Sequence, residues 1–392
     1  MAYTTTTTTS FGQRIKNSFG GIVVGIMMFI AGTILLFWNE GRTVKTTRML
    51  KEAESKCVEL ADISAVDKAF EGQVVHATGL ATTDEVLKED VFGIKANAIK
   101  LIREVEYYQV VERTETKTET DSRGRETQTT TYFYEPKWTD EPVDSKKFYY
   151  TDEQDDNFVL KEIADLTLQA KDVKFGAYRL PDALISQKND SENLAIEPDQ
   201  AILDAFSRDI ANAMRKSGTK YVHVEGNRIY FGVNPGEAHI GDVRVKFSTV
   251  GNGNVSIIAK VVNDTFEKFT AKSGYSLERL TAGTHSSEDM FASERSNNKA
   301  TAWLLRIIGI LLIFFGLRNI FKFIETTTSI VPVLGSIVKF GIGLASFLIT
   351  IAWSFIVIAV GWLFYRPLLG ILMLAGGCAL IWYLNKKGKE KE

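Results

Sequence analysis

Four long runs of apolar residues without acidic groups stand out along the chain. They cover residues 19–38, 302–324, 340–365 and 367–384. At about 1.5 Å per helical residue, even the shortest run nearly matches a hydrocarbon core of about 30 Å. The pattern predicts four transmembrane helices, with a polar extramembrane domain at 39–301 inserted between the first two.

The ends of these runs carry the residues that typically anchor helices at membrane interfaces. The predicted anchors are Trp38, Trp362, Tyr365, Arg366, Trp382 and Tyr383. The second run is the least apolar, because Arg306, Arg318 and Lys322 leave a charge-free centre of only 307–317. These three cations lie near its ends, where long side chains can reach the interface. A cleaved signal peptide is disfavoured for the first run, because no small-residue cleavage site precedes Trp38.

Basic residues in the short segments predict the orientation. The tail 1–18, the loop 325–339 and the tail 385–392 fall on one side of a four-span protein and hold most of the flanking Lys and Arg. Both termini are therefore expected in the cytoplasm, and the domain in the lumen or, in a prokaryote, in the periplasm. The loop 325–339 is predicted as a short interfacial helix or an ordinary loop. The run Thr4–Thr9 is predicted to be disordered.

Residues 39–301 read as an α+β domain with a mainly antiparallel sheet. Strands are predicted at 73–80, 99–112, 131–138, 174–180, 221–224, 240–250 and 255–262, where β-branched and aromatic residues accumulate. Gly226-Asn227 and Gly251-Asn252-Gly253 are interpreted as hairpin turns. Apolar residues at helical spacing predict a helix over 199–215, and 287–300 should form a helix that runs into the second span.

The segment 113–130 has no apolar face. Threonines alternate with charged residues on both sides of a turn near Ser122-Arg123-Gly124. Such a hairpin should project into solvent, stabilised by cross-strand Thr–Thr and charge pairs. It is either a partner-contacting arm or a solvated excursion.

Composition excludes several functions. The formal net charge is −2 and no basic stripe carries interleaved aromatics, so nucleic acid is not an expected partner. The four histidines, His76, His223, His239 and His285, lack the spacing of a metal site, and the acidic group Asp152, Glu153, Asp155 and Asp156 lacks that of a calcium loop. No catalytic motif is present, which predicts a protein without enzymatic activity, cofactor or metal.

Small residues line one face of two predicted spans. Gly21, Gly25 and Gly32 share a face of the first span, and Gly341, Ala345, Ala352 and Ala359 share a face of the third. Small residues allow helix backbones to approach closely within lipid. The pattern predicts either packing of four helices within one chain or self-association between chains.

Several segments together resemble the LUMA family, also called transmembrane protein forty-three, over essentially the whole chain. The resemblance is carried by Asn39-Glu40-Gly41-Arg42, residues 71–76, 107–112, Tyr134 with Trp138, 145–148, Gly241-Asp242-Val243-Arg244 with 245–247, 272–274, Glu294-Arg295-Ser296-Asn297 leading to Trp303, and 361–368. It implies four spans with one large lumenal domain. It also implies location in the endoplasmic reticulum and inner nuclear membrane in animals, self-association, and a role in organising membrane protein complexes. The family has no established catalytic residues.

These observations favour a non-enzymatic membrane scaffold that forms homo-oligomers and binds other membrane proteins. An ion channel or channel-associated subunit is the alternative, although the first, third and fourth spans lack ionisable residues at mid-depth. A membrane-lipid enzyme built around His285, Asp289 and Glu294 is less favoured, because these residues also suit a polar linker into the second span.

Overall fold

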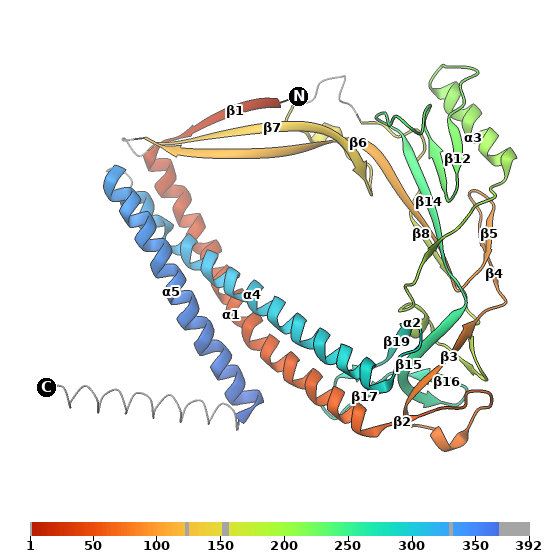
Figure 1. Cartoon of the computed structure of the whole chain (residues 1–392). Coiled ribbons are helices and arrows are strands. Elements are labelled where there is room, and N and C mark those ends of the chain that lie inside the picture. The colour runs from red at the N-terminus through yellow and green to blue at the C-terminus, as the bar shows by residue number, and fades with distance from the viewer. Residues whose placement is uncertain (1, 122–124, 151–156, 329–331, 368–392) are drawn as a thin grey trace.

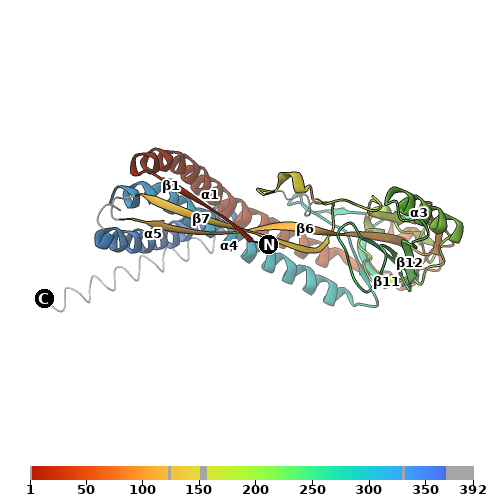
Figure 2. The same cartoon turned by 90° about the horizontal axis from the view of Figure 1, so that it is seen from above.

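The computed structural model describes residues 2–121, 125–150, 157–328 and 332–367. The molecule is elongated, with a helical bundle at one end and a sheet-rich domain at the other (Figures 1 and 2). Three described helices are long and apolar enough to cross a membrane, within Phe11–Lys56, Ser287–Thr326 and Phe340–Tyr365. The fourth predicted span, 367–384, with its anchors Trp382 and Tyr383, lies almost wholly outside the described residues.

Two antiparallel helices connect the bundle to the domain. Helix α1 covers Phe11–Lys56 and helix α4 covers Ser287–Thr328. Helix α1 continues well past Trp38, the end of the predicted first span, and enters the domain. The predicted helix at 287–300 is confirmed as the start of α4. Many apolar side chains of both helices point outward, such as Ile34 at 62% and Leu304 at 58% exposure, as expected for contact with lipid.

Helix α5 covers Pro332–Tyr365 and packs against both α1 and α4. The sequence predicts a loop or separate short helix at 325–339, but α4 reaches residue 328 and α5 starts at Pro332. Residues 332–339 thus form the first turns of α5, ahead of its candidate span at Phe340–Tyr365, instead of an independent element. Proline suits this start because the first turn of a helix needs no backbone N–H from it.

The domain contains two large sheets. The first has eight strands, β1 (Ala2–Thr9), β6 (Lys100–Thr120), β7 (Glu126–Thr139), β8 (Leu166–Gln169), β11 (Glu192–Asn193), β12 (Val222–Glu225), β13 (Arg228–Phe231) and β14 (Val243–Val250). The second has seven, β2 (Cys57–Glu59), β3 (Val74–Thr82), β9 (Lys174–Phe175), β10 (Tyr178–Arg179), β15 (Gly253–Val262), β16 (Thr265–Glu267) and β19 (Arg279–Ala282). Pairing is antiparallel except for β2–β3 and β10–β16.

Smaller elements complete the domain. Two-stranded sheets join β4 (Val86–Glu89) to β5 (Ile94–Asn97) and β17 (Phe269–Thr270) to β18 (Ser276–Leu277). Short helices are η1 (Lys68–Phe70), η2 (Ser145–Lys147) and α2 (Asp182–Ile185). The predicted helix at 199–215 is confirmed as α3 (Gln200–Ala213), and the Asp199 side chain accepts a hydrogen bond from Ala201 N at its start. Its buried Leu203 and Ile210 join a core formed by the inner faces of the strands.

One predicted turn has a different role in the structure. Gly226-Asn227 does join the antiparallel strands β12 and β13. Residues 251–253, however, do not form a hairpin, because β14 belongs to the first sheet and β15 to the second. Asn252 Oδ1 accepts a hydrogen bond from Thr83 N at 2.9 Å, which holds this connection against the start of a neighbouring loop. The sequence predicts the bend but not the change of sheet.

The polar segment 113–130 forms the outer part of the β6–β7 hairpin, and the structure does not describe its tip at 122–124. We call this outer hairpin, together with β1, the arm. The prediction of disorder at Thr4–Thr9 is wrong, because β1 pairs antiparallel with β7 from Ala2–Phe133 to Thr9–Glu126. Threonine favours strands, and the free edge of β7 supplies hydrogen-bonding groups. Figure 1 shows the arm reaching from the domain to the N-terminal end of α1.

Candidate functional site

A buried carboxylate joins the three described membrane helices where they leave the apolar zone. Glu40 on α1 is fully buried and accepts hydrogen bonds from Arg306 on α4 at 2.7 and 3.0 Å. Its Oε2 also accepts the indole N–H of Trp362 on α5 at 2.8 Å. A buried charge is tolerated only when it is paired and hydrogen-bonded, and here partners on two other helices meet that need.

Neighbouring residues tighten this contact. Asn39 is also fully buried and donates from Nδ2 to the carbonyl oxygen of Ala302 at 2.9 Å. A Cβ atom added to Gly361 would lie 3.0 Å from Glu40 Cβ, and one added to Gly41 would lie 2.6 Å from the Tyr365 ring. Glycine at these two positions therefore lets α5 approach α1. We call Asn39, Glu40, Gly41, Arg306, Gly361 and Trp362 the boundary junction.

Side chains beyond the junction extend the contacts along α1. Arg42 lies 3.5 Å from Asn39 Oδ1, and Arg48 donates to the carbonyl oxygen of Tyr365 at 2.8 Å. Arg295 forms an ion pair with Glu54 at 2.7 Å on the polar side of the junction. Of the other residues quoted for the family resemblance, Glu294 pairs with Arg279 at 2.7 Å, and Asn297 is exposed.

The predicted small-residue face of α1 lies against α4. A Cβ atom added to Gly25 would lie 2.6 Å from the carbonyl oxygen of Gly316, and one added to Gly32 would lie 2.7 Å from that of Gly309. Gly21 lies at the edge of this contact, where an added Cβ would be 3.9 Å from the oxygen of Asn319. These glycines serve packing within the chain, which is one of the two uses predicted for them.

The predicted small-residue face of α5 lies elsewhere. Nothing described would lie within 4 Å of a Cβ at Gly341, and Ala345, Ala352 and Ala359 are exposed. A different face of α5 packs into the bundle, and its buried members are Ser346, Thr350, Ser354, Val357 and Gly361. The hydroxyls of Ser346 and Ser354 have no hydrogen-bond partner among the described residues. Part of the apolar surface of α5 is thus left uncovered by the described chain.

The residues 241–247 quoted for the family resemblance anchor the arm to the domain. Asp242 is buried and accepts hydrogen bonds from Tyr230 Oη at 2.6 Å and His239 N at 2.8 Å. Burial raises the pKa of Asp242. Its backbone oxygen accepts Tyr108 N at 2.8 Å, which ties it to β6. A side chain at Gly241, where φ is +96°, would overlap the ring of Phe158.

Arg244 reinforces the same attachment. It donates from Nη2 to Glu106 Oε1 on β6 at 2.7 Å, and its guanidinium lies 4.2 Å from the ring centre of Trp138 on β7. The pKa of Glu106 is lowered, first by its hydrogen bond with Arg244. The residues at the base of the arm thus hold β6, β7 and β14 together.

The residues considered for lipid chemistry do not meet in one site. His285 Nε2 contacts the carbonyl oxygen of Ala282, Asp289 accepts from Ser286 at the start of α4, and Glu294 binds Arg279. His76 is buried, with Nδ1 2.7 Å from Glu59 and Nε2 3.0 Å from the His285 carbonyl oxygen. Within the described ranges, no group of three potential metal ligands is found. The acidic residues 152, 153, 155 and 156 lie outside those ranges.

Sequence reasoning missed the pairing of Arg306 with Glu40. Arg306 was expected to reach outward to the interface, whereas its side chain turns toward α1 and is only 16% exposed. The available signal was Glu40 itself, an acidic residue that follows directly on an apolar run. A carboxylate that is buried there needs a cation on a neighbouring helix, because an unpaired buried charge is costly.

Comparisons with known proteins place this chain in a family. The family model described as Transmembrane protein 43 matches residues 107–367. Proteins named Transmembrane protein 43 from Pongo abelii and Homo sapiens are 31% and 30% identical to this chain, each over 95% of it and 90% of the relative. The Drosophila melanogaster protein named Transmembrane protein 43 homolog is 28% identical over 95% of this chain and 96% of its own length.

No solved structure matches this chain. The family name denotes a membrane protein and names no enzymatic activity, and the three apolar helices likewise imply a lipid bilayer. The chain belongs to the Transmembrane protein 43 family, also called the LUMA family.

Proposed function

We propose that this protein is a non-enzymatic membrane scaffold that self-associates through its membrane helices and gathers other membrane proteins through its sheet domain. The family resemblance supports the same role and, in an animal cell, a location in the endoplasmic reticulum and inner nuclear membrane. The proposal commits to α5 as the helix through which copies of the chain associate.

The uncovered face of α5 is the observation that carries this proposal. Ala345 and Ala352 are exposed along a helix whose opposite face is already packed in the bundle. Leu348 at 58% and Phe355 at 70% exposure flank them. Small residues between larger apolar ones allow close helix association in lipid. A second copy of the chain can use this face without displacing α1 or α4.

A rigid connection between membrane and domain supports the scaffold role. Helix α1 runs without interruption from the bundle to Lys56, and β2 begins at the next residue and pairs with β3. Helix α4 returns alongside it and ends in the bundle. Copies that associate through α5 would therefore hold their sheet domains at a fixed spacing.

Substitution of the uncovered face tests this function. In Ala345→Leu/Ala352→Leu, added bulk should separate copies of the chain and weaken self-association by about tenfold or more, which corresponds to roughly 1.4 kcal/mol. Oligomer size is measured in lipid nanodiscs by single-molecule photobleaching over a range of protein densities. Ala31→Leu, at an exposed position on α1, is the matched control and should leave self-association unchanged.

Two outcomes contradict the proposal. If the wild-type protein stays monomeric at every density, the chain does not self-associate. If the double variant associates as strongly as wild type, copies of the chain do not contact each other through this face of α5. If the double variant instead loses its cooperative unfolding while the wild type is monomeric, residues 345 and 352 serve packing within the chain.

A further inference from the structure

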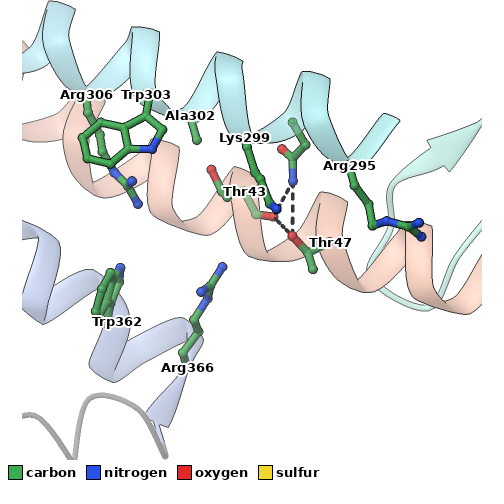
Figure 3. A pocket seen from close by; sticks show the side chains of 10 residues that line it. Thr43, Thr47, Arg295, Lys299, Ala302, Trp303, Arg306, Trp362 and Arg366 are labelled. Atoms are coloured by element: carbon green, nitrogen blue, oxygen red, sulfur yellow. Dashed lines mark hydrogen bonds between the residues drawn. The ribbon is translucent and has the colours of Figure 1, made fainter. Parts of the chain in front are cut away.

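Two hollows meet at the boundary junction and share the side chains of Trp303, Arg306 and Trp362. The polar hollow, of about 400 Å³, lies between α1, α4 and the end of α5 (Figure 3). The apolar hollow, also of about 400 Å³, lies next to it between α4 and α5. The two hollows adjoin at these three side chains, and we call them together the groove.

The polar hollow carries uncompensated positive charge. Its lining includes Arg295, Lys299, Arg306 and Arg366, and no carboxylate of the described chain lines it. Arg295 and Arg306 are neutralised by Glu54 and Glu40. Lys299 and Arg366 form no ion pair within the described ranges. Figure 3 shows Arg366 extending from the end of α5 toward the space beside Lys299 and Thr43. This placement favours a ligand with a negative charge, because two cations share one partly enclosed space.

A buried acceptor adds a second requirement. Asn298, which lines the same hollow, is 7% exposed, and its Nδ2 donates to Thr43 O and Thr47 Oγ1 at 3.2 Å each. Its Oδ1 is buried without a partner in the described part of the chain. An unsatisfied buried acceptor is costly, so the bound state gains a contact if a small rotation of the Asn298 amide brings this oxygen to a hydrogen-bond donor of the ligand.

The apolar hollow matches the depth of one membrane leaflet. It extends along α5 from Trp362 to Ile351, a rise of roughly 16 Å at 1.5 Å per residue, about half of a 30 Å hydrocarbon core. Ile307 and Ile310 on α4 and Phe355 and Ile358 on α5 form its walls. These side chains suit an acyl chain that lies parallel to the helices.

We propose that this groove binds one anionic glycerophospholipid. Its phosphate lies between Lys299 and Arg366, a hydroxyl or amine of its headgroup donates to Asn298 Oδ1, and an acyl chain lies along the apolar hollow. Phosphatidylglycerol and phosphatidylserine both have this combination of charge, donor and chain. The bound lipid thereby fills both hollows, with its headgroup between α1, α4 and the end of α5 and its acyl chain between α4 and α5. This inference does not depend on the proposed scaffold role.

Lipid retention tests the charge requirement. Full-length protein is purified in mild detergent, and the co-purifying lipids are quantified for each chain by mass spectrometry. Wild type should retain about one anionic phospholipid, and Lys299→Gln/Arg366→Gln should lower this retention by about tenfold or more, because two charge-assisted contacts are lost. The control Lys45→Gln/Lys51→Gln removes the same charge from α1 outside the groove and should retain the lipid.

A steric variant tests the apolar hollow without changing charge. Ala359 lines this hollow and is exposed, so Ala359→Trp should fill it and also reduce lipid retention. In phosphatidylcholine nanodiscs, adding phosphatidylglycerol should raise the unfolding temperature of wild type but not of either groove variant. Inorganic phosphate alone should give no such rise, because it lacks the acyl chain.

Specific results would overturn the proposal. Equal retention by wild type and both groove variants excludes the groove as the binding site. Equal losses in the groove and control double variants show only a general attraction of anionic lipid to cations. A disulfide between Phe355→Cys and a cysteine placed within 368–384, formed in protein that retains no lipid, would assign the apolar hollow to the chain's own last segment.

Discussion

The helical pair α1–α4 and the arm are both long antiparallel structures that extend from the sheet domain, but different forces stabilise them. The helices contact each other through glycines, where an added Cβ would lie 2.6–2.7 Å from a backbone oxygen of the other helix. The arm has exposed or half-buried polar side chains on both faces from Glu115 to Thr120, and its strands are joined by backbone hydrogen bonds. One structure depends on close packing and buried charge, the other on its backbone ladder.

This difference predicts where a substitution should lower the stability of the protein most. In the helical pair, one added methyl group or one lost charge changes a contact that involves two or three helices. In the arm, each cross-strand pair contributes only about 0.2–1 kcal/mol and neighbouring pairs remain when one is lost. Stability should therefore be sensitive to sequence in the bundle and tolerant in the arm.

The largest effect is expected at Glu40. Glu40→Ala leaves Arg306 buried without its anionic partner, which should lower the free energy of unfolding by about 3–5 kcal/mol. Unfolding in detergent micelles, followed by circular dichroism, measures this change. The control Glu54→Ala removes the partly exposed partner of Arg295 and should cost no more than about 1 kcal/mol. Similar costs for the two variants would show that the boundary junction is not a buried ion pair.

The next largest effect concerns the glycine contact. Gly32→Val places side-chain atoms against the backbone of Gly309 and should destabilise the protein by about 1–3 kcal/mol. Gly20→Val is the matched control, because nothing described lies within 4 Å of a Cβ there. The same unfolding assay compares them. Equal destabilisation would mean that a β-branched side chain in this helix, and not close packing against Gly309, accounts for the result.

The arm gives a smaller effect on stability and a decisive result on membrane orientation. Deletion of residues 2–9 should lower the free energy of unfolding by about 1–2 kcal/mol, because it removes polar edge pairs and the ring contacts of Tyr3 with Tyr134 and Tyr150. Thr6 lies directly opposite Thr129, so Thr6→Cys/Thr129→Cys should form a disulfide under oxidation. Thr6→Cys/Thr131→Cys, two residues out of register, is the control and should cross-link less.

The same cysteine pair tests a conflict between the predicted membrane orientation and the observed pairing of β1 with β7. The basic flanks predict residues 1–18 and the domain on opposite sides of the membrane, whereas β1 pairs with a strand of that domain. A ribbon polar on both faces cannot cross lipid unless protein or water covers it. Cross-linking in native membranes would contradict the predicted orientation, and cross-linking only after detergent extraction would support it.

The smallest effect is a pH dependence at the base of the arm. The pKa of Asp242 is raised by burial, so the folded state binds a proton more readily than the unfolded state. Stability is then highest at low pH for this group and falls as pH rises from about 3.9 toward the folded pKa. Asp242→Asn should remove this slope in unfolding curves measured across that range. A slope unchanged in the variant would assign the effect to other carboxylates.

The sequence predicts the parts of the fold that have a regular pattern. Helical spacing of Ile202, Phe206 and Ile210 locates α3, and alternating Thr and charge at 113–130 locates the outer hairpin. Gly25 and Gly32, which stand out in the sequence by their spacing, lie at the contact of α1 with α4. These features are local, so a single segment contains the information needed to predict them.

Features that depend on distant partners were not predictable in this way. The pairing of Thr4–Thr9 depends on a free strand edge more than a hundred residues later, and the bend at 251–253 gives no sign of which sheet follows. At the boundary junction, Asn39 and Glu40 were quoted only for their family resemblance. Their partners Ala302, Arg306 and Trp362 lie on helices whose relative rotation the sequence does not specify.

The unbroken course of α1 makes the bilayer and the domain mechanically dependent on each other. From Trp38 to Lys56 the helix rises roughly 27 Å, so a tilt of about 10°, well within the range by which spans adjust to bilayer thickness, displaces its far end by roughly 5 Å. Strand β2 starts at that end and is hydrogen-bonded to β3. A change in membrane thickness that tilts α1 would therefore displace the second sheet, because the rotation about the headgroup region is transmitted along the helix to β2.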